Sequence, residues 1–281
     1  MKTWKKIVLG VSLISLFLGG GLVAWGYSQG GLTDLQNQTK SEQDYVKKEV
    51  KDFNKIDIKS SSYNVLIKNG DVDKATLSYY QKTKNPIDTS VKDGQLTIND
   101  NNSELDSTSN KHINFFGLKD LVRLSTLNEE VRNKTIVITL PKKQTIDFLK
   151  VDLATGNLDL SNSTIKQADI NLNVGDLTFT KMIVSNLKAN LDVGSVDSDH
   201  TLFTNSDLSI AMGDYSGDNL IFNGHNKLDV TSGNIELALK DYTLNVQADS
   251  HSGEVDITNN LKISKDNTLT ITSDLGDITV E

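Results

Sequence analysis

Seven glycines recur at nearly constant spacing in the second half of this chain, and their period limits the possible folds more than any other feature. The intervals between them are 19, 19, 19, 20, 20 and 23 residues. A repeat of this length cannot bury its own apolar face, so it has to stack on copies of itself. The seven residues are Gly156, Gly175, Gly194, Gly213, Gly233, Gly253 and Gly276.

Apolar residues keep a fixed distance from each of these glycines. The second residue after every glycine is apolar, as in Leu158 and Leu177, and so is the fifth residue before it, as in Val151 and Ile170. Polar residues alternate with these positions, which is the period of a β-strand and not of a helix. We therefore expect an all-β fold in which residues 151–281 form a β-solenoid, with one coil per repeat.

The glycines themselves are expected to be structural corner residues of the coil. A residue without a Cβ can adopt left-handed or otherwise strained dihedral angles where the chain turns. The next residue is usually Asn, Asp or Ser, and these types favour turns because their side chains bond to nearby backbone.

The N-terminus has the features of a membrane anchor. Lys2, Lys5 and Lys6 precede an uncharged stretch over residues 7–27, and about 20 apolar residues cross a bilayer as a helix. The positive-inside rule predicts a cytoplasmic stub and one transmembrane helix within residues 1–27, with the C-terminal domain extracellular. The alternative is a cleaved signal peptide, with Ala24 and Gly26 at its processing site.

Two further regions precede the repeats. Residues 28–52 are polar and mixed in charge, which predicts a linker or stalk with a helical second half as one option. The folded domain is expected over residues 53–281. Within it, short strands are predicted at 56–58, 63–67, 75–80, 95–98 and 135–140, with turns at residues 69–71 and at Asp93-Gly94.

Residues 101–134 interrupt this pattern as an insertion. A polar loop is followed by an apolar segment in which Phe115, Phe116, Leu118 and Leu121 are candidate partner-binding residues. One interpretation is a cap that covers the open end of the solenoid. The other is a segment that faces the membrane or binds a partner.

The charge distribution narrows the choice of partners. The formal net charge is −8, and because the three N-terminal lysines give residues 1–27 a charge of +3, the remaining residues carry −11. An acidic surface repels nucleic acid and anionic lipid headgroups and attracts cations, including cationic peptides. We expect no nucleic-acid partner. The absence of cysteine excludes disulfides and thiolate metal sites.

No catalytic motif with the required context is present, and no catalytic, cofactor-binding or metal-binding residue is predicted. The four histidines fall at different phases of the repeat, which argues against a zinc site. Polar columns through Asp152 and Asp176 would form ladders in stacked coils, either as turn formers or as a weak calcium site. The alternative function is a carbohydrate-active β-helix enzyme on cell-wall glycans, with an acid such as Asp197 or Asp214.

The segments at 53–58, 63–71 and 136–141, followed by the glycine repeats from Leu149, resemble a known bacterial family. It is the adhesin-like β-strand-repeat domain of unknown function in Firmicute cell-envelope proteins, including those encoded with Lia-type envelope stress systems. The resemblance covers about residues 53–281 and implies an extracytoplasmic β-solenoid that serves in envelope stress or surface interaction. An envelope-stress membrane protein is one partner that it implies. The expected function is therefore a membrane-anchored, non-enzymatic binding or structural protein, with an adhesin as a further alternative.

Overall fold

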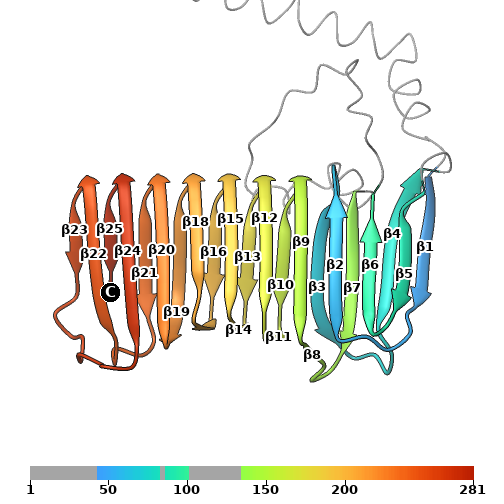
Figure 1. Cartoon of the computed structure of the whole chain (residues 1–281), viewed down its shortest axis with the longest axis horizontal. Helices are drawn as coiled ribbons and strands as arrows, with labels where there is room; N and C mark the ends of the chain where they lie inside the picture. The colour runs from blue at the N-terminus through green and yellow to red at the C-terminus, as the bar shows by residue number, and fades with distance from the viewer. Residues whose placement is uncertain (1–42, 83–85, 101–133) are drawn as a thin grey trace, which may run out of the picture. The chain divides into compact units, whose positions relative to one another are not determined.

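The computed structural model describes residues 43–82, 86–100 and 134–281, and Asp44–Glu281 form one compact unit. Every regular element in these ranges is a β-strand, so the all-β prediction is confirmed there (Figure 1). The same ranges contain no helix that could cross a membrane. The stretch predicted to do so, residues 7–27, lies outside them, as do Phe115, Phe116, Leu118 and Leu121.

A ten-stranded sheet forms one long side of the unit. Its neighbouring strands are parallel, except for the antiparallel hairpin of β5 and β6. In spatial order the strands are β22 (Asn245–Ser252), β24 (Thr268–Leu275), β20 (His225–Ser232), β18 (Asp207–Met212), β15 (Leu187–Val193), β12 (Ala168–Val174), β9 (Phe148–Thr155), β2 (Lys55–Ser60), β6 (Gln95–Asn99) and β5 (Asp88–Lys92).

A fifteen-stranded sheet forms the remaining sides, and we divide it into a long arm and a short arm. The long arm contains β1 (Gln43–Glu49), β4 (Thr76–Lys82), β7 (Thr135–Pro141), β3 (Asn64–Gly70), β10 (Leu158–Ser161), β13 (Leu177–Thr180), β16 (Val196–Asp199), β19 (Tyr215–Asn223), β21 (Ile235–Leu239), β25 (Ile278–Val280) and β23 (Val255–Ile257). The short arm contains β17 (Leu202–Thr204), β14 (Ile183–Ser185), β11 (Thr164–Ile165) and β8 (Thr145–Ile146). Strand β19 belongs to both arms because it pairs with β16 and with β17.

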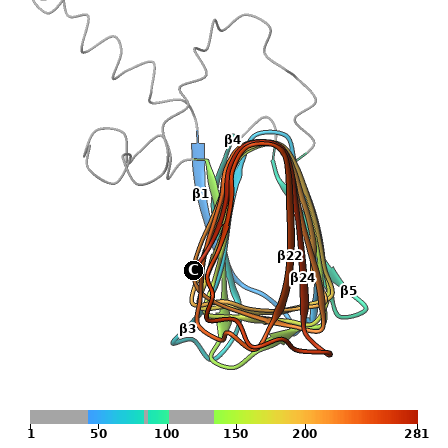
Figure 2. The same cartoon turned by 90° about the vertical axis from the view of Figure 1, so that its left-hand side faces the viewer.

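In the coils of Gly156, Gly175, Gly194 and Gly213, the chain runs up the ten-stranded sheet, turns at the glycine, runs down the long arm and returns through the short arm (Figure 2). The coils of Gly233, Gly253 and Gly276 have no strand in the short arm. Apolar side chains fill the interior in columns, one residue per coil. One column joins Val151, Ile170, Ala189, Leu208, Leu228 and Ile271, all at most 4% exposed. The period of the sequence is therefore the period of a shared core.

The last two coils do not stack in chain order. Strands β24 and β25, which come last in the sequence, lie between β20 and β21 on one side and β22 and β23 on the other (Figure 1). The coil that carries Gly253 is therefore outermost, and the coil that carries Gly276 is inserted beneath it. In the outermost coil, Val246, Ala248 and Leu261 are only partly buried, because among the described residues no further coil covers them.

The first strand corrects one prediction. Strand β1 occupies Gln43–Glu49, so this part of the expected linker is extended and not helical. The Tyr45 ring lies 4.8 Å from that of Tyr80, and the backbone N–H of Val50 donates to the carbonyl oxygen of Ala75 at 2.8 Å. These contacts hold β1 against the sheet.

Candidate functional site

The glycine corners place one coil directly on the next. Six of the seven glycines, all except Gly253, have φ between +143° and +150°. A Cβ added to Gly194 would lie 2.0 Å from the carbonyl oxygen of Gly175, and the other corner glycines meet the neighbouring coil in the same way. These residues serve the stack and present no side chain to a ligand.

The residues after the glycines form a ladder of hydrogen bonds between coils. The Asn157 side-chain oxygen accepts from the backbone N–H of Asp176 at 2.9 Å, and the Asp176 carboxylate accepts from that of Ser195 at 3.0 Å. The ladder also follows the crossed order of the last coils, since Asp277 accepts from the N–H of Glu254 at 2.8 Å. This column of corner oxygens is therefore structural turn chemistry. Within the described residues no group of acids and histidines could hold a metal ion.

Acids and hydroxyls alternate on the outer face of the long arm. Neighbouring strands place in register, in order, Asp159, Thr178, Asp197, Ser216, Glu236, Thr279 and Asp256, which we call the acid–hydroxyl row. Strands lie about 4.8 Å apart, so successive acids are about 10 Å apart, which is close to the Debye length at physiological salt. Their mutual repulsion is therefore largely screened.

The environment of Asp159 shows the cost of burying a member of this row. Burial raises the pKa of its carboxyl above the ordinary value, and repulsion from Asp176 acts in the same direction. A hydrogen bond with Thr178 opposes this rise in pKa. By contrast, Glu236 and Asp256, further along the row, are exposed.

The ten-stranded sheet carries a different electrostatic pattern. In register across its strands, acids and lysines alternate through Asp57, Lys150, Asp169, Lys188, Asp207 and Lys227. This row has no net charge, and opposite charges face each other at every step. By contrast, strands β10, β13, β16, β19, β21, β23 and β25 of the long arm contain no lysine or arginine. The acid–hydroxyl row therefore has no cation within its own strands.

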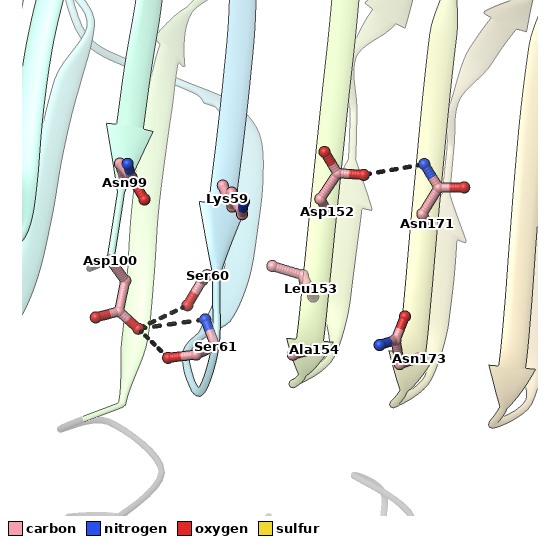
Figure 3. A pocket seen from close by; sticks show the side chains of 10 residues that line it. All are labelled: Lys59, Ser60, Ser61, Asn99, Asp100, Asp152, Leu153, Ala154, Asn171 and Asn173. Atoms are coloured by element: carbon pink, nitrogen blue, oxygen red, sulfur yellow. Dashed lines mark hydrogen bonds between the residues drawn. The ribbon is translucent and has the colours of Figure 1, made fainter. Parts of the chain in front are cut away.

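A cavity of about 580 Å³ opens at the carboxyl ends of β2, β6, β9 and β12. Figure 3 shows Asn99, Lys59, Asp152 and Asn171 in one line across these four strands, with the Asn171 amide donating to the Asp152 carboxylate at 3.0 Å. At one end of the cavity, the buried Asp100 carboxylate accepts from the hydroxyls of Ser60 and Ser61 at 3.2 and 3.0 Å. The lining combines these polar side chains with Leu153 and Ala154, and it has a single cation and no aromatic ring.

Asp197 and Asp214, the two acids that the sequence offers for a carbohydrate-active enzyme, belong to two different repeated rows. Asp197 is one of four acids in the acid–hydroxyl row, and Asp214 belongs to the corner ladder, where it accepts from the N–H of Asn234 at 2.7 Å. His200 lies at a left-handed bend with φ of +48°, and its ring contacts the Asp199 carboxylate. The His225 ring forms a hydrogen bond with the Thr268 hydroxyl. The alternating charge row was not predicted from the sequence, although Lys150, Asp169, Lys188 and Asp207 follow one another at 19-residue intervals.

The fold therefore places the chain in a class of all-β proteins that are built as a stack of parallel coils with a polar exterior. The model of the family described as Toastrack DUF4097 matches residues 53–281, and the chain belongs to that family of domains of unknown function. A comparison with curated proteins found no match.

Solved structures with weak overall similarity include three bacterial proteins. A candidate cell adhesion protein from Clostridium sporogenes is 17% identical, with 85% of this chain and 98% of that one covered and a TM-score of 0.37. A candidate adhesin from Bacteroides fragilis is 16% identical, over 86% and 98% of the two chains, with a TM-score of 0.37. A candidate lipid binding protein from Parabacteroides distasonis is 11% identical, over 86% and 98%, with a TM-score of 0.36.

Proposed function

We propose that the chain is a non-enzymatic binding protein of the cell envelope, tethered to the membrane by residues 7–27, with its solenoid outside the cell. In this proposal it acts in envelope stress or surface interaction by holding a cationic partner, which is either a cationic peptide or a basic segment of a membrane protein. The acid–hydroxyl row is the observation that carries the proposal.

Three properties of the row support a cationic partner. Its acids are spaced evenly along a straight line, so an extended chain with regularly spaced lysines can meet several of them at once. The seven strands that carry the row contain no basic residue, so an external cation meets no competitor within them. Glu236 and Asp256 are exposed, and contacts between exposed charges weaken as salt rises.

The repetition of the row favours binding over catalysis. Acid hydrolysis of a glycan needs two carboxyls in different environments, one kept protonated and one ionised. Asp197 and Glu236 recur with the coil and each lie between two hydroxyl residues. Such a row offers an extended partner several similar contacts.

The test compares two variants with the same net charge. In the row variant, Asp197→Asn, Glu236→Gln and Asp256→Asn remove three charges from the acid–hydroxyl row. In the control variant, Asp57→Asn, Asp169→Asn and Asp207→Asn remove three charges from the other sheet. Binding of a fluorescent oligolysine to the full-length chain in uncharged detergent is measured by anisotropy at about 50 and about 500 mM NaCl.

We expect the wild type and the control variant to bind the peptide at low salt and to release it at high salt. The row variant is expected to bind at least about tenfold more weakly, since each exposed charge contact contributes a few tenths to about 1 kcal/mol. Equal losses in the two variants would mean that only net charge matters. Protease added to intact cells tests the location, because residues after 28 should be degraded if they lie outside.

A further inference from the structure

A second cavity, of about 450 Å³, lies beside the first one on the ten-stranded sheet. It opens over β15, β18, β20 and β24, and its lining includes Asn190, Ser209, Asp229 and Thr272. The first cavity ends at Asn171 of β12, and Asn171 is in register with Asn190. The two cavities are therefore neighbours along the axis of the stack.

One row of side chains joins the two cavities. Register places Lys59, Asp152, Asn171, Asn190, Ser209, Asp229 and Thr272 side by side on successive strands. We call this row with its two cavities the polar groove. Seven strands at about 4.8 Å make it about 30 Å long. A site that is straight, open and repeated at every strand fits a linear polymer better than a compact molecule.

The chemistry of the polar groove favours a ligand that both donates and accepts hydrogen bonds. The Asn190 amide donates to the Asn171 oxygen at 2.9 Å, and the Asn171 amide donates to Asp152. The Asn171 amide also donates to the Asp169 carboxylate at 3.5 Å. Each amide nitrogen carries two N–H groups and each oxygen two lone pairs, so the ladder bonds leave capacity on the Asn171 oxygen and on the Asn190 amide. Asp229 bonds to Thr272 and pairs with Lys227, which reduces its attraction for cations. Asp192 and Asp274 also line the second cavity, and their carboxylates are further acceptors for the hydroxyl groups of a ligand.

The same lining argues against other ligand classes. Lys59 is the one cation in the first cavity and the second cavity has none, while carboxylates occur in both, so a polyanion is repelled. The side chains of the row are polar, so an apolar chain gains little there. A hydroxyl-rich neutral polymer satisfies the amides, hydroxyls and carboxylates without a charge penalty.

We propose that the polar groove binds a linear neutral glycan without cleaving it. This site is separate from the acid–hydroxyl row and does not depend on the function proposed for that row. Because the cavities offer no aromatic platform, single sugars bind weakly, and affinity grows with the number of sugars that lie in the groove.

The test uses oligomers of β-linked N-acetylglucosamine and of β-linked glucose as probes of the full-length chain, with binding followed by calorimetry. We expect chains of about six sugars to bind at least about tenfold more tightly than disaccharides, as linked contacts add up. We expect the same affinity at low and high salt, because the ligand is uncharged. The two sugar series separate recognition of the acetamido group from recognition of the hydroxyls alone.

A matched pair of threonine substitutions locates the site. Thr231 is exposed and lines the second cavity, so Thr231→Trp should block the groove without touching the amide ladder. Thr180 lies on the long arm, and Thr180→Trp is the control. Asn171→Ala is a second variant that removes groove contacts, with its thermal melting recorded alongside.

Binding that is lost in Thr231→Trp and kept in Thr180→Trp supports the proposal. Equal binding by the two tryptophan variants, or no saturable binding of any oligomer by the wild type, would overturn it. Release of new reducing ends would overturn the absence of cleavage. The row variant should still bind the glycan, so failure of this proposal can be told apart from failure of the cationic partner.

Discussion

Substitution of a central corner glycine should destabilise the stack strongly, and Gly194→Ala is the sharpest case. Its φ of +149° belongs to a region that is used almost only by glycine, which costs another residue about 1–3 kcal/mol. The new Cβ would also lie 2.0 Å from the carbonyl oxygen and 2.6 Å from the carbonyl carbon of Gly175. Overpacking of this kind costs a further ~1–3 kcal/mol.

The two costs together predict a loss of about 4 kcal/mol in the free energy of unfolding, a large part of the roughly 5–15 kcal/mol of a typical domain. Gly70→Ala is the matched control, because its added Cβ meets only the Thr139 side-chain methyl and its φ is not left-handed. Its cost should stay below about 1 kcal/mol, since a side chain can move aside.

The assay is urea unfolding of the full-length chain, followed by circular dichroism. With a slope of about 2–3 kcal/mol per molar urea, a loss of about 4 kcal/mol in Gly194→Ala should lower the midpoint by roughly 1.3–2 M relative to wild type. If the midpoints of Gly194→Ala and Gly70→Ala agreed within the error of the measurement, the glycine would not be needed for close approach of the coils. The account of the period would then be wrong.

Three smaller predictions concern polar groups. Burial raises the pKa of the Asp159 carboxyl in the folded state. The wild type should therefore lose stability as the pH rises from the pKa of this carboxyl in the unfolded chain through its pKa in the folded chain. Asp159→Asn should remove this loss, as measured by urea titrations at several pH values. Burial also raises the pKa of Tyr215, whose hydroxyl donates to Ser198 at 3.0 Å, so stability should fall above about pH 10 and Tyr215→Phe should flatten that fall while costing about 1 kcal/mol at neutral pH. The buried Ser273 hydroxyl has no hydrogen-bond partner among the described residues, so Ser273→Ala should raise the thermal midpoint, and a lower midpoint would contradict this.

The period of the coils could be predicted because it depends on the residue types at local positions in each repeat. A corner that brings one backbone within reach of the next tolerates only glycine, and the strand alternation fixes which residues face inward. The Asp93-Gly94 turn could be predicted for the same reason, and it joins the antiparallel strands β5 and β6 with φ values of +50° and +72°.

The left-handed bends at the second corner were harder to predict. They recur at 19-residue intervals through Asn162, Lys181, His200 and Asn219. Asparagine and histidine are enriched at such angles, but lysine is not. At Lys181 the residue type therefore gives little warning of the bend.

The crossed order of the last coils could not be predicted from the pattern. The coils of Gly253 and Gly276 carry the same kinds of residue at equivalent positions, such as Ala248 and Ile271, or Val255 and Ile278. Either coil could therefore lie against Gly233, and only the fold as a whole decides between them. The polar groove could not be predicted for a related reason. Its cavities depend on which columns of side chains lie on the outer face of the ten-stranded sheet.

The parallel coils stack in register, and the last coil is inserted beneath the one before it. The chain has no cysteine, so paired substitutions can read this order directly by disulfide formation, which needs Cα atoms less than about 7 Å apart. Asp229 is in register with Thr272, and Thr272 with Asp249, which puts Asp229 and Asp249 two strands, about 10 Å, apart. We predict that Asp229→Cys with Thr272→Cys forms a disulfide under mild oxidation and that Asp229→Cys with Asp249→Cys does not. A disulfide in the second pair and none in the first would contradict the account.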